Sequence, residues 1–138
     1  MGQIFIKLTI KNRRDEIKAK DGIISFDQVR SITLSGVCAD TGAFNLALPI
    51  DVIERLGLEY FKEITANTAN GKVVRKKFKD ATIYLEDRMT TVECVELPIG
   101  STPLLGAFPM EALGVNPNVM TRQLDFLPEM GENTHIML

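Results

Sequence analysis

The 138-residue sequence predicts a mainly β domain with two short helices. Three observations favour this class. An alternating apolar strand opens the chain, turn residues mark two hairpins in its middle, and the helical periods span only about two turns. The apolar fraction of 45% and the charged fraction of 25% are ordinary for a globular protein, and the length is sufficient for one domain with a buried core.

The first half of the chain predicts three strands and one helix. The charged segment 11–22 is either a loop or one short exposed helix, and a second short helix is considered at 26–30. Apolar residues at three-residue spacing before Gly57 predict a helix over 50–56, which follows Pro49. Alternating apolar and polar residues predict strands at 3–10, 31–40 and 44–49.

The second half predicts two hairpins, a helix and a last strand. Asn70-Gly71 is the strongest hairpin signal in the chain, because both residues tolerate positive φ at the centre of a tight turn. The other expected elements are a hairpin with arms at 82–85 and 91–97 around a turn at 86–89, a short apolar strand before Gly106, a helix at 109–113 ended by Gly114, and a strand at 122–128.

Charge and cysteine content argue against several classes of function. The net charge of -2 and the pI near 5.4 do not favour nucleic acid as a partner, and the basic run Arg75 to Lys79 is interpreted as a solvated strand face. Cys38 and Cys94 lie far apart, and the only histidine, His135, is in the polar C-terminal tail. We therefore expect no metal, no cofactor and no Cys-His or Ser-His catalytic pair.

Signals for export, acylation or membrane insertion are not expected either. The first residues do not combine a basic region with an apolar core. Met1-Gly2 is compatible with N-myristoylation, but Ile6 stands where that motif requires Ser or Thr. No apolar stretch approaches the length of a membrane span. We expect a cytoplasmic protein with reduced thiols and no membrane partner.

One stretch carries a functional signal, Val37 to Pro49, in which an apolar run reaches Asp40 and breaks into Thr41-Gly42. As turn chemistry this tripeptide is common, since Asp bonds its own backbone two residues on and Gly supplies positive φ. As catalytic chemistry, two carboxylates that share one proton activate a water and polarise a carbonyl without metal, serine or cysteine. A tight loop with a hydroxyl and a glycine after the carboxylate fits this need.

Three motifs in order carry a family resemblance. The first is the strand entering "ADTGA" (39–43), followed by "LALP" and "IDVIERLGL"; the second is the polar hairpin with Asn70-Gly71 at its tip; the third is "PLLGAFPMEALGV" (103–115). With these motifs, residues 31–126 resemble the retropepsin-like aspartic proteases (clan AA), of the prokaryotic single-domain type. The resemblance implies a retropepsin-like acid protease fold, a closed β-barrel with one or two short helices and one DTG loop per chain.

The resemblance also implies roles for single residues. Asp40 would be the catalytic carboxylate, Thr41 would bond to the equivalent loop of a second subunit, and Gly42 would let the loop approach the substrate. Cys38 either lines a substrate pocket or is a small buried apolar residue. The other implied roles are packing and substrate contact for Ala43, support of the loop for Leu104, Leu105 and Gly106, and a flap over the peptide for Thr68, Ala69, Asn70, Gly71, Lys72 and Val73.

Only one aspartate is followed by Thr-Gly or Ser-Gly, so one chain supplies half of a catalytic pair. The leading hypothesis is therefore a homodimeric aspartic endopeptidase that cleaves a peptide or protein substrate. The alternative, favoured by the polar flap tip, is a catalytically silent dimerisation or peptide-binding module. We expect one retropepsin-like domain over 1–138, with a core at 1–10 and 31–127, an insertion at 11–30 and a tail at 128–138.

Overall fold

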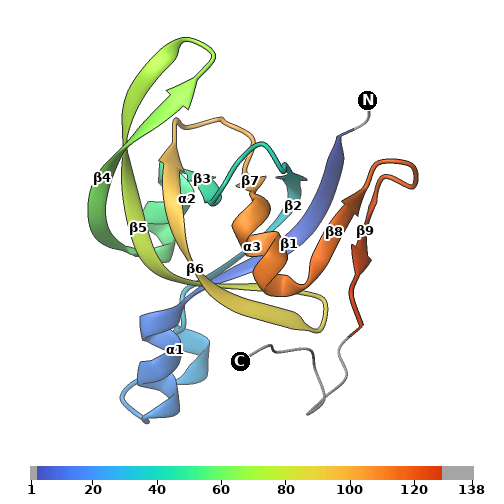
Figure 1. Ribbon diagram of the computed structural model, residues 1–138. Helices are drawn as coiled ribbons and strands as arrows, with labels where there is room; N and C mark the ends of the chain where they lie inside the picture. Colours follow the sequence, from blue (N-terminus) through green and yellow to red (C-terminus); the bar gives the residue numbers. More distant parts are fainter. Residues whose placement is uncertain (1–2, 129–138) are drawn as a thin grey trace, which may run out of the picture.

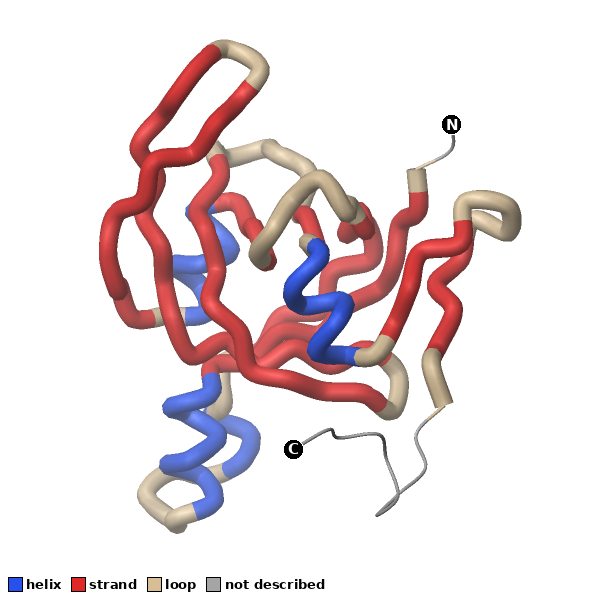
Figure 2. The backbone as a smooth tube through the Cα atoms, viewed as in Figure 1, coloured by secondary structure: helices blue, strands red, loops and turns tan. Residues whose placement is uncertain are grey.

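The computed structural model describes residues 3–128 and contains mostly strands (Figure 1, Figure 2). Met1, Gly2 and residues 129–138, which include His135 and nearly all of the expected tail, lie outside the described residues. The strands are β1 (Ile4–Asn12), β2 (Ser31–Ala39), β3 (Leu46–Pro49), β4 (Glu59–Thr68), β5 (Gly71–Leu85), β6 (Arg88–Leu97), β7 (Leu104–Leu105), β8 (Val115–Asn118) and β9 (Gln123–Phe126). The helices are α1 (Arg13–Lys20), α2 (Ile50–Leu56), α3 (Ala107–Leu113) and a 3₁₀ turn at Phe26–Gln28.

Seven strands form one sheet in the order β1-β2-β7-β3-β6-β5-β4, and β1 also pairs with β5. Six strands, in the order β1, β2, β7, β3, β6 and β5, therefore close into a ring. Strand β4 pairs with β5 outside this ring, and β8 and β9 form a separate hairpin. The mainly β class is confirmed. Of the three α-helices in the described residues, α2 and α3 match the two expected ones, and α1 lies in the expected insertion.

The core fills the inside of the ring. Strand β1 alternates as expected, so Leu8 and Ile10 are fully buried, whereas Phe5 remains half exposed. Helices α2 and α3 each turn one apolar side to this core, because their apolar residues recur at helical spacing. The largest fully buried side chains include Leu8, Ile10, Leu46, Leu48, Ile53, Leu56, Ile83 and Leu105.

Strand β5 is the main difference from the sequence prediction, because its 15 residues serve both hairpins. Residues 71–79 of β5 pair with β4, and residues 77–85 pair with β6. The pairing with β6 shifts register between Phe78 and Ala81, where Asp80 has a φ of 65°. This bulge lets one strand bend from the ring into the projecting hairpin.

The tip of the β4–β5 hairpin also differs from the prediction. Thr68 pairs with Gly71, so Ala69 and Asn70 form the centre of the turn instead of Asn70-Gly71. Asn70 does not have positive φ, whereas Gly71 has a φ of 103°. Glycine at the position after a two-residue turn is the arrangement of a turn closed by a bulge, and the Asn-Gly pair fits that turn as well as the expected one.

The 11–30 segment contains α1, so of the two alternatives for residues 11–22, a loop or a short helix, the structure shows the helix. This segment is anchored to the core. The Asn12 side chain caps α1 by accepting a hydrogen bond from the Asp15 amide at 3.0 Å, and it donates to the Leu56 carbonyl at 2.9 Å. Buried Asp15 accepts hydrogen bonds from the Arg30 guanidinium at 2.8 and 3.0 Å. The hydrogen bond with Arg30 lowers the pKa of Asp15. Among residues 3–128, no helix is long and apolar enough to cross a membrane.

Candidate active site

The loop 40–45 contains Asp40 and is positioned by the short strand β7. Strand β7 lies between β2 and β3, parallel to β2 and antiparallel to β3. The chain leaves β2 at Ala39, passes over the end of β7 through the loop, and returns on the other side of it as β3 (Figure 1). Leu105, buried in the core, thus sits directly under the loop.

Backbone hydrogen bonds tie this loop to β7 and to the start of α3. The Asp40 amide donates to the carbonyl of Leu105 at 2.9 Å. The first amides of α3 have no partner within the helix, so they are free to donate to the loop. They do so in three bonds: Gly106 to the Asn45 carbonyl at 3.0 Å, Ala107 to Ala43 at 2.8 Å and Phe108 to Phe44 at 3.0 Å.

Gly106 allows this close approach. A Cβ at this position would lie 2.5 Å from the Asn45 oxygen, 2.6 Å from the Phe44 carbonyl carbon and 2.7 Å from the Ala43 oxygen. All three are backbone atoms of the loop, so no side-chain movement relieves the contact. The glycine after two leucines is therefore a steric requirement of the loop–helix contact.

The Asp40 carboxylate lies at the head of a tight turn. Its Oδ1 accepts a hydrogen bond from the Gly42 amide at 2.8 Å, and the Asp40 carbonyl accepts one from the Ala43 amide at 3.1 Å. The expectation that glycine supplies positive φ here is wrong, since Gly42 is not among the residues with positive φ. A Cβ on Gly42 would meet Oδ1 at 3.1 Å, so closeness to the carboxylate favours glycine.

Asp40 is half-buried, and Thr41 and Gly42 are exposed. Within residues 3–128, the Thr41 hydroxyl makes no hydrogen bond. A pocket of about 270 Å³ opens beside the carboxylate, and Cys38 and Thr41 also line it. Sequence analysis missed its other walls, since only tertiary packing brings them to Asp40: Gln3 and Ile4 of the β1 end, and Pro117 and Val119 of the β8–β9 hairpin.

Cys38 is buried, as one interpretation of the sequence expected, and it lines the pocket beside Asp40. The other interpretation, that it lines a substrate pocket, stays a prediction. Burial raises the pKa of its thiol, and the neighbouring Asp40 charge raises it further. The thiol is therefore held protonated and is a poor nucleophile. Of the described residues that line the pocket, Asp40 is the only carboxylate.

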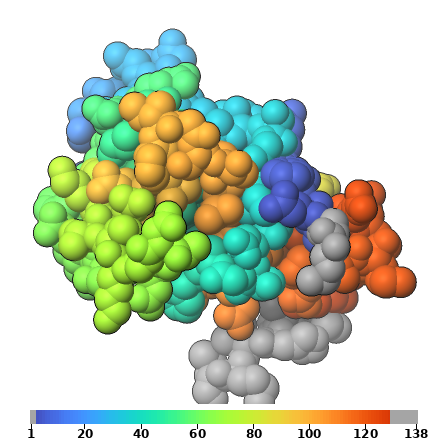
Figure 3. All heavy atoms as spheres, turned by 90° about the horizontal axis from the view of Figure 1, so that it is seen from above, coloured from blue at the N-terminus to red at the C-terminus, as the bar shows by residue number. Residues whose placement is uncertain are grey.

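The hairpin tip with Thr68, Ala69, Asn70, Gly71, Lys72 and Val73 projects on the same side of the molecule as the loop 40–45 (Figure 1). The view from above shows both on one face, together with the segment before β7 (Figure 3). Most of these tip residues are exposed, and none of them lines the pocket at Asp40. The single chain does not bring the expected flap residues to the carboxylate.

The ring of strands, with an aspartate loop held over β7, fits the acid-protease class expected from the sequence. A family model described as aspartyl protease matches residues 31–108, which is more than half of the chain. The chain belongs to this retropepsin-like aspartyl protease family, which confirms the family expected from the sequence. No curated protein sequence matches the chain significantly.

Proposed function

We propose that the protein is a homodimeric aspartic endopeptidase in which the Asp40 carboxylates of two copies share one proton. The observation that carries this proposal is the geometry of Asp40: its loop is tied to β7 and α3, and its carboxylate borders an open pocket that no second carboxylate among residues 3–128 lines. A second copy related by a two-fold axis would supply the missing carboxylate.

Two carboxylates this close at such an axis do not both ionise, so the pair holds one shared proton. The ionised carboxylate takes a proton from a water, and the water oxygen attacks the scissile carbonyl carbon. The protonated carboxyl gives its proton to the carbonyl oxygen, which yields a tetrahedral diol. The carboxyl that took the proton from water then gives it to the amide nitrogen, while the other carboxylate removes a proton from one diol hydroxyl. The C–N bond breaks, an amine and a carboxylic acid leave, and the pair again holds one proton.

Other residues of the loop and hairpin support the same arrangement. The exposed Thr41 hydroxyl is available to bond across the two-fold axis. The tip 68–73 would close over an extended peptide, which would bind partly through strand-like backbone hydrogen bonds. Leu104, Leu105 and Gly106 would keep the carboxylate in place through the loop they support. The substrate is proposed to be a peptide or a protein segment in extended form.

The decisive experiment is cleavage of a diverse peptide mixture between about pH 4 and pH 7, read by mass spectrometry. Wild type is compared with Asp40→Asn and with Asp51→Asn, which changes an exposed aspartate of α2. We expect cleavage by wild type and Asp51→Asn and none by Asp40→Asn. Equal cleavage by Asp40→Asn would contradict the assignment. A folded, dimeric wild type that cleaves nothing would favour the catalytically silent binding module. The polar residues of the hairpin tip are the feature that supports this alternative.

A mixing experiment tests the shared site directly. A fixed amount of wild type is titrated with excess Asp40→Asn, with Asp51→Asn as the matched control. If each active site needs two Asp40 residues, mixed dimers are inactive and the activity per wild-type chain falls steeply with the excess. Activity that is unchanged by the excess would show that one chain suffices, and it would refute the homodimeric site.

A further inference from the structure

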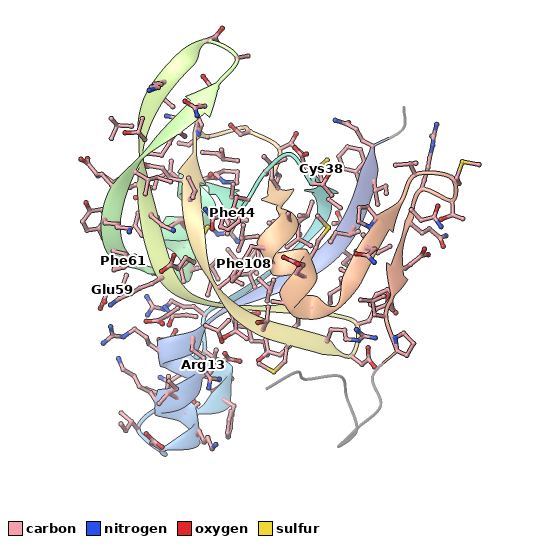
Figure 4. The ribbon with its side chains drawn as sticks, in the orientation of Figure 1. Arg13, Cys38, Phe44, Glu59, Phe61 and Phe108 are labelled. Carbon is pink, nitrogen blue, oxygen red and sulfur yellow. The ribbon has the colours of Figure 1, made fainter. Side chains whose placement is uncertain are left out.

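Two phenylalanines beside the candidate active site are exposed to solvent. Phe44 is 66% exposed and Phe108 is 51% exposed, although both rings are large and apolar. The rings stack on one another with centroids 5.5 Å apart and an interplanar angle of 25°. Both residues belong to the loop–helix contact, where the Phe108 amide donates to the Phe44 carbonyl (Figure 4). An exposed aromatic pair on a rigid backbone is a typical binding surface.

The pair forms one wall of a groove of about 480 Å³. Pro109 of α3 continues this apolar wall. Strands β5 and β6 form the opposite wall, through Lys77, Lys79, Asp80, Thr91, Val92 and Glu93. Lys77 and Glu93 form an ion pair at 2.7 Å, so their charges neutralise each other. Lys79 pairs with Glu59 of β4 at 3.0 Å. The groove therefore has one aromatic wall and one polar, charged wall, and the aromatic wall suits a large apolar side chain.

The groove adjoins the candidate active site through the loop 40–45, which contributes Phe44 and Asn45 to its lining. Phe44 is four residues after Asp40, so it lies within about 14 Å of it along the backbone. Lys77 lies near the middle of β5, the strand that begins at Gly71 of the hairpin tip. An extended peptide held between Asp40 and the hairpin thus reaches this groove within about four of its own residues.

We infer that the groove at Phe44 and Phe108 is an outer subsite that selects a large apolar side chain of the substrate, within about four residues of the scissile bond. This inference rests on the proposed protease function and names its substrate class. The stacked rings supply the contact surface, and their backbone is held by the same hydrogen bonds that hold the Asp40 loop.

The test uses peptides derived from one that wild type cleaves. Phenylalanine and alanine are compared at each of the four positions on either side of the scissile bond, and kcat/KM is measured for each pair. We expect wild type to favour phenylalanine by about tenfold at one of these positions. Phe44→Ser and Phe108→Ser should reduce that ratio to about one, and Phe44→Leu should retain most of it.

Phe61→Ser is the matched control, because Phe61 is 43% exposed on β4 and does not line the groove. It should leave the ratio unchanged. If Phe108→Ser unfolds, the more exposed Phe44 decides the result. A preference that survives in Phe44→Ser overturns the inference and leaves the protease intact, as does a wild type that cleaves without any such preference. A wild type that cleaves no peptide overturns the proposed function and the subsite with it.

The same variants distinguish a second occupant of the groove, another copy of the chain. Their oligomeric state is measured by analytical ultracentrifugation over a range of concentrations. We expect Phe44→Ser to dimerise like wild type. Weakened dimerisation with an unchanged ratio would assign the rings to the interface between copies and would overturn the subsite.

Discussion

The loop 40–45 and the hairpin tip 68–73 lie on the same face of the molecule, but they are held in different ways. Backbone hydrogen bonds tie the loop to β7 and α3, and the loop packs so closely on Gly106 that no Cβ fits between them. The tip is held by bonds within itself: the Thr68 hydroxyl donates to the Gly71 carbonyl at 2.7 Å and accepts from the Asn70 amide at 3.2 Å. The proposed catalytic carboxylate is thus supported by other elements of the fold, whereas the proposed cover is supported by its own hairpin.

The largest expected effect breaks the loop side of this comparison. Gly106→Ala forces a methyl group against three backbone atoms of the loop. We expect a loss of about 2–3 kcal/mol in the free energy of unfolding and a fall of about 100-fold in peptide cleavage, because the loop must move. Gly36→Ala is the control, since a Cβ there meets nothing within 4 Å and should change stability by less than about 0.5 kcal/mol. Urea unfolding and the peptide assay measure both variants.

A second effect is the loss of folding stability at acidic pH, which matters because the peptide assay extends into that range. Because Arg30 holds the pKa of Asp15 below its ordinary value, the pair stabilises the protein above about pH 4, and this contribution is lost as the pH falls further. Asp15→Asn should lower the free energy of unfolding by about 2 kcal/mol at neutral pH. The difference from wild type should shrink below about pH 4 in urea unfolding at stepped pH. A difference that is constant with pH would contradict this.

The hairpin side of the comparison is tested by Gly71→Ala. Gly71 has a φ of 103°, and a Cβ there meets nothing within 4 Å, so the penalty comes from backbone conformation alone. We expect a loss of about 1 kcal/mol, clearly less than that of Gly106→Ala. Thermal unfolding of both variants side by side gives the comparison. Equal losses would mean that the tip is as tightly supported as the loop.

The smallest effect is expected at the anchored end of β5, the strand that carries the tip. The Tyr84 hydroxyl donates a hydrogen bond to Glu16 of α1. Burial is the main cause and this hydrogen bond the second cause that raise the pKa of Tyr84 to about 12. A raised pKa stabilises the folded state below about pH 10, and the contribution is lost as the pH rises toward the folded value. Tyr84→Phe should change the unfolding free energy by less than about 1 kcal/mol. It should also remove the late step from the tyrosinate absorbance titration.

Local patterns predicted much of the fold and the centre of the candidate site. The period of β1, the helices at 50–56 and 109–113, and the Asp-Thr-Gly loop depend on near neighbours in the chain. The sequence predicted strand β5 as two separate strands, because its charged residues 71–79 and the bulge at Asp80 interrupt the alternation of apolar and polar residues. The turn at the tip was misplaced by one residue, because Asn-Gly suits more than one turn geometry. Strand β8 was missed, since its four residues have no alternating apolar pattern.

The sequence by itself determined the family, the order of the motifs and the position of the one aspartate followed by Thr-Gly, because these depend on residue type and spacing alone. The tertiary structure decided which residues surround that aspartate. Only the insertion of β7 between β2 and β3 explains why Gly106 must be small. The pairing of β1 with β2 places Gln3 beside Asp40, and the separate β8–β9 hairpin contributes Val119. The contact between the loop and α3 leaves Phe44 and Phe108 exposed together, and all of these contacts join segments that lie far apart in the chain.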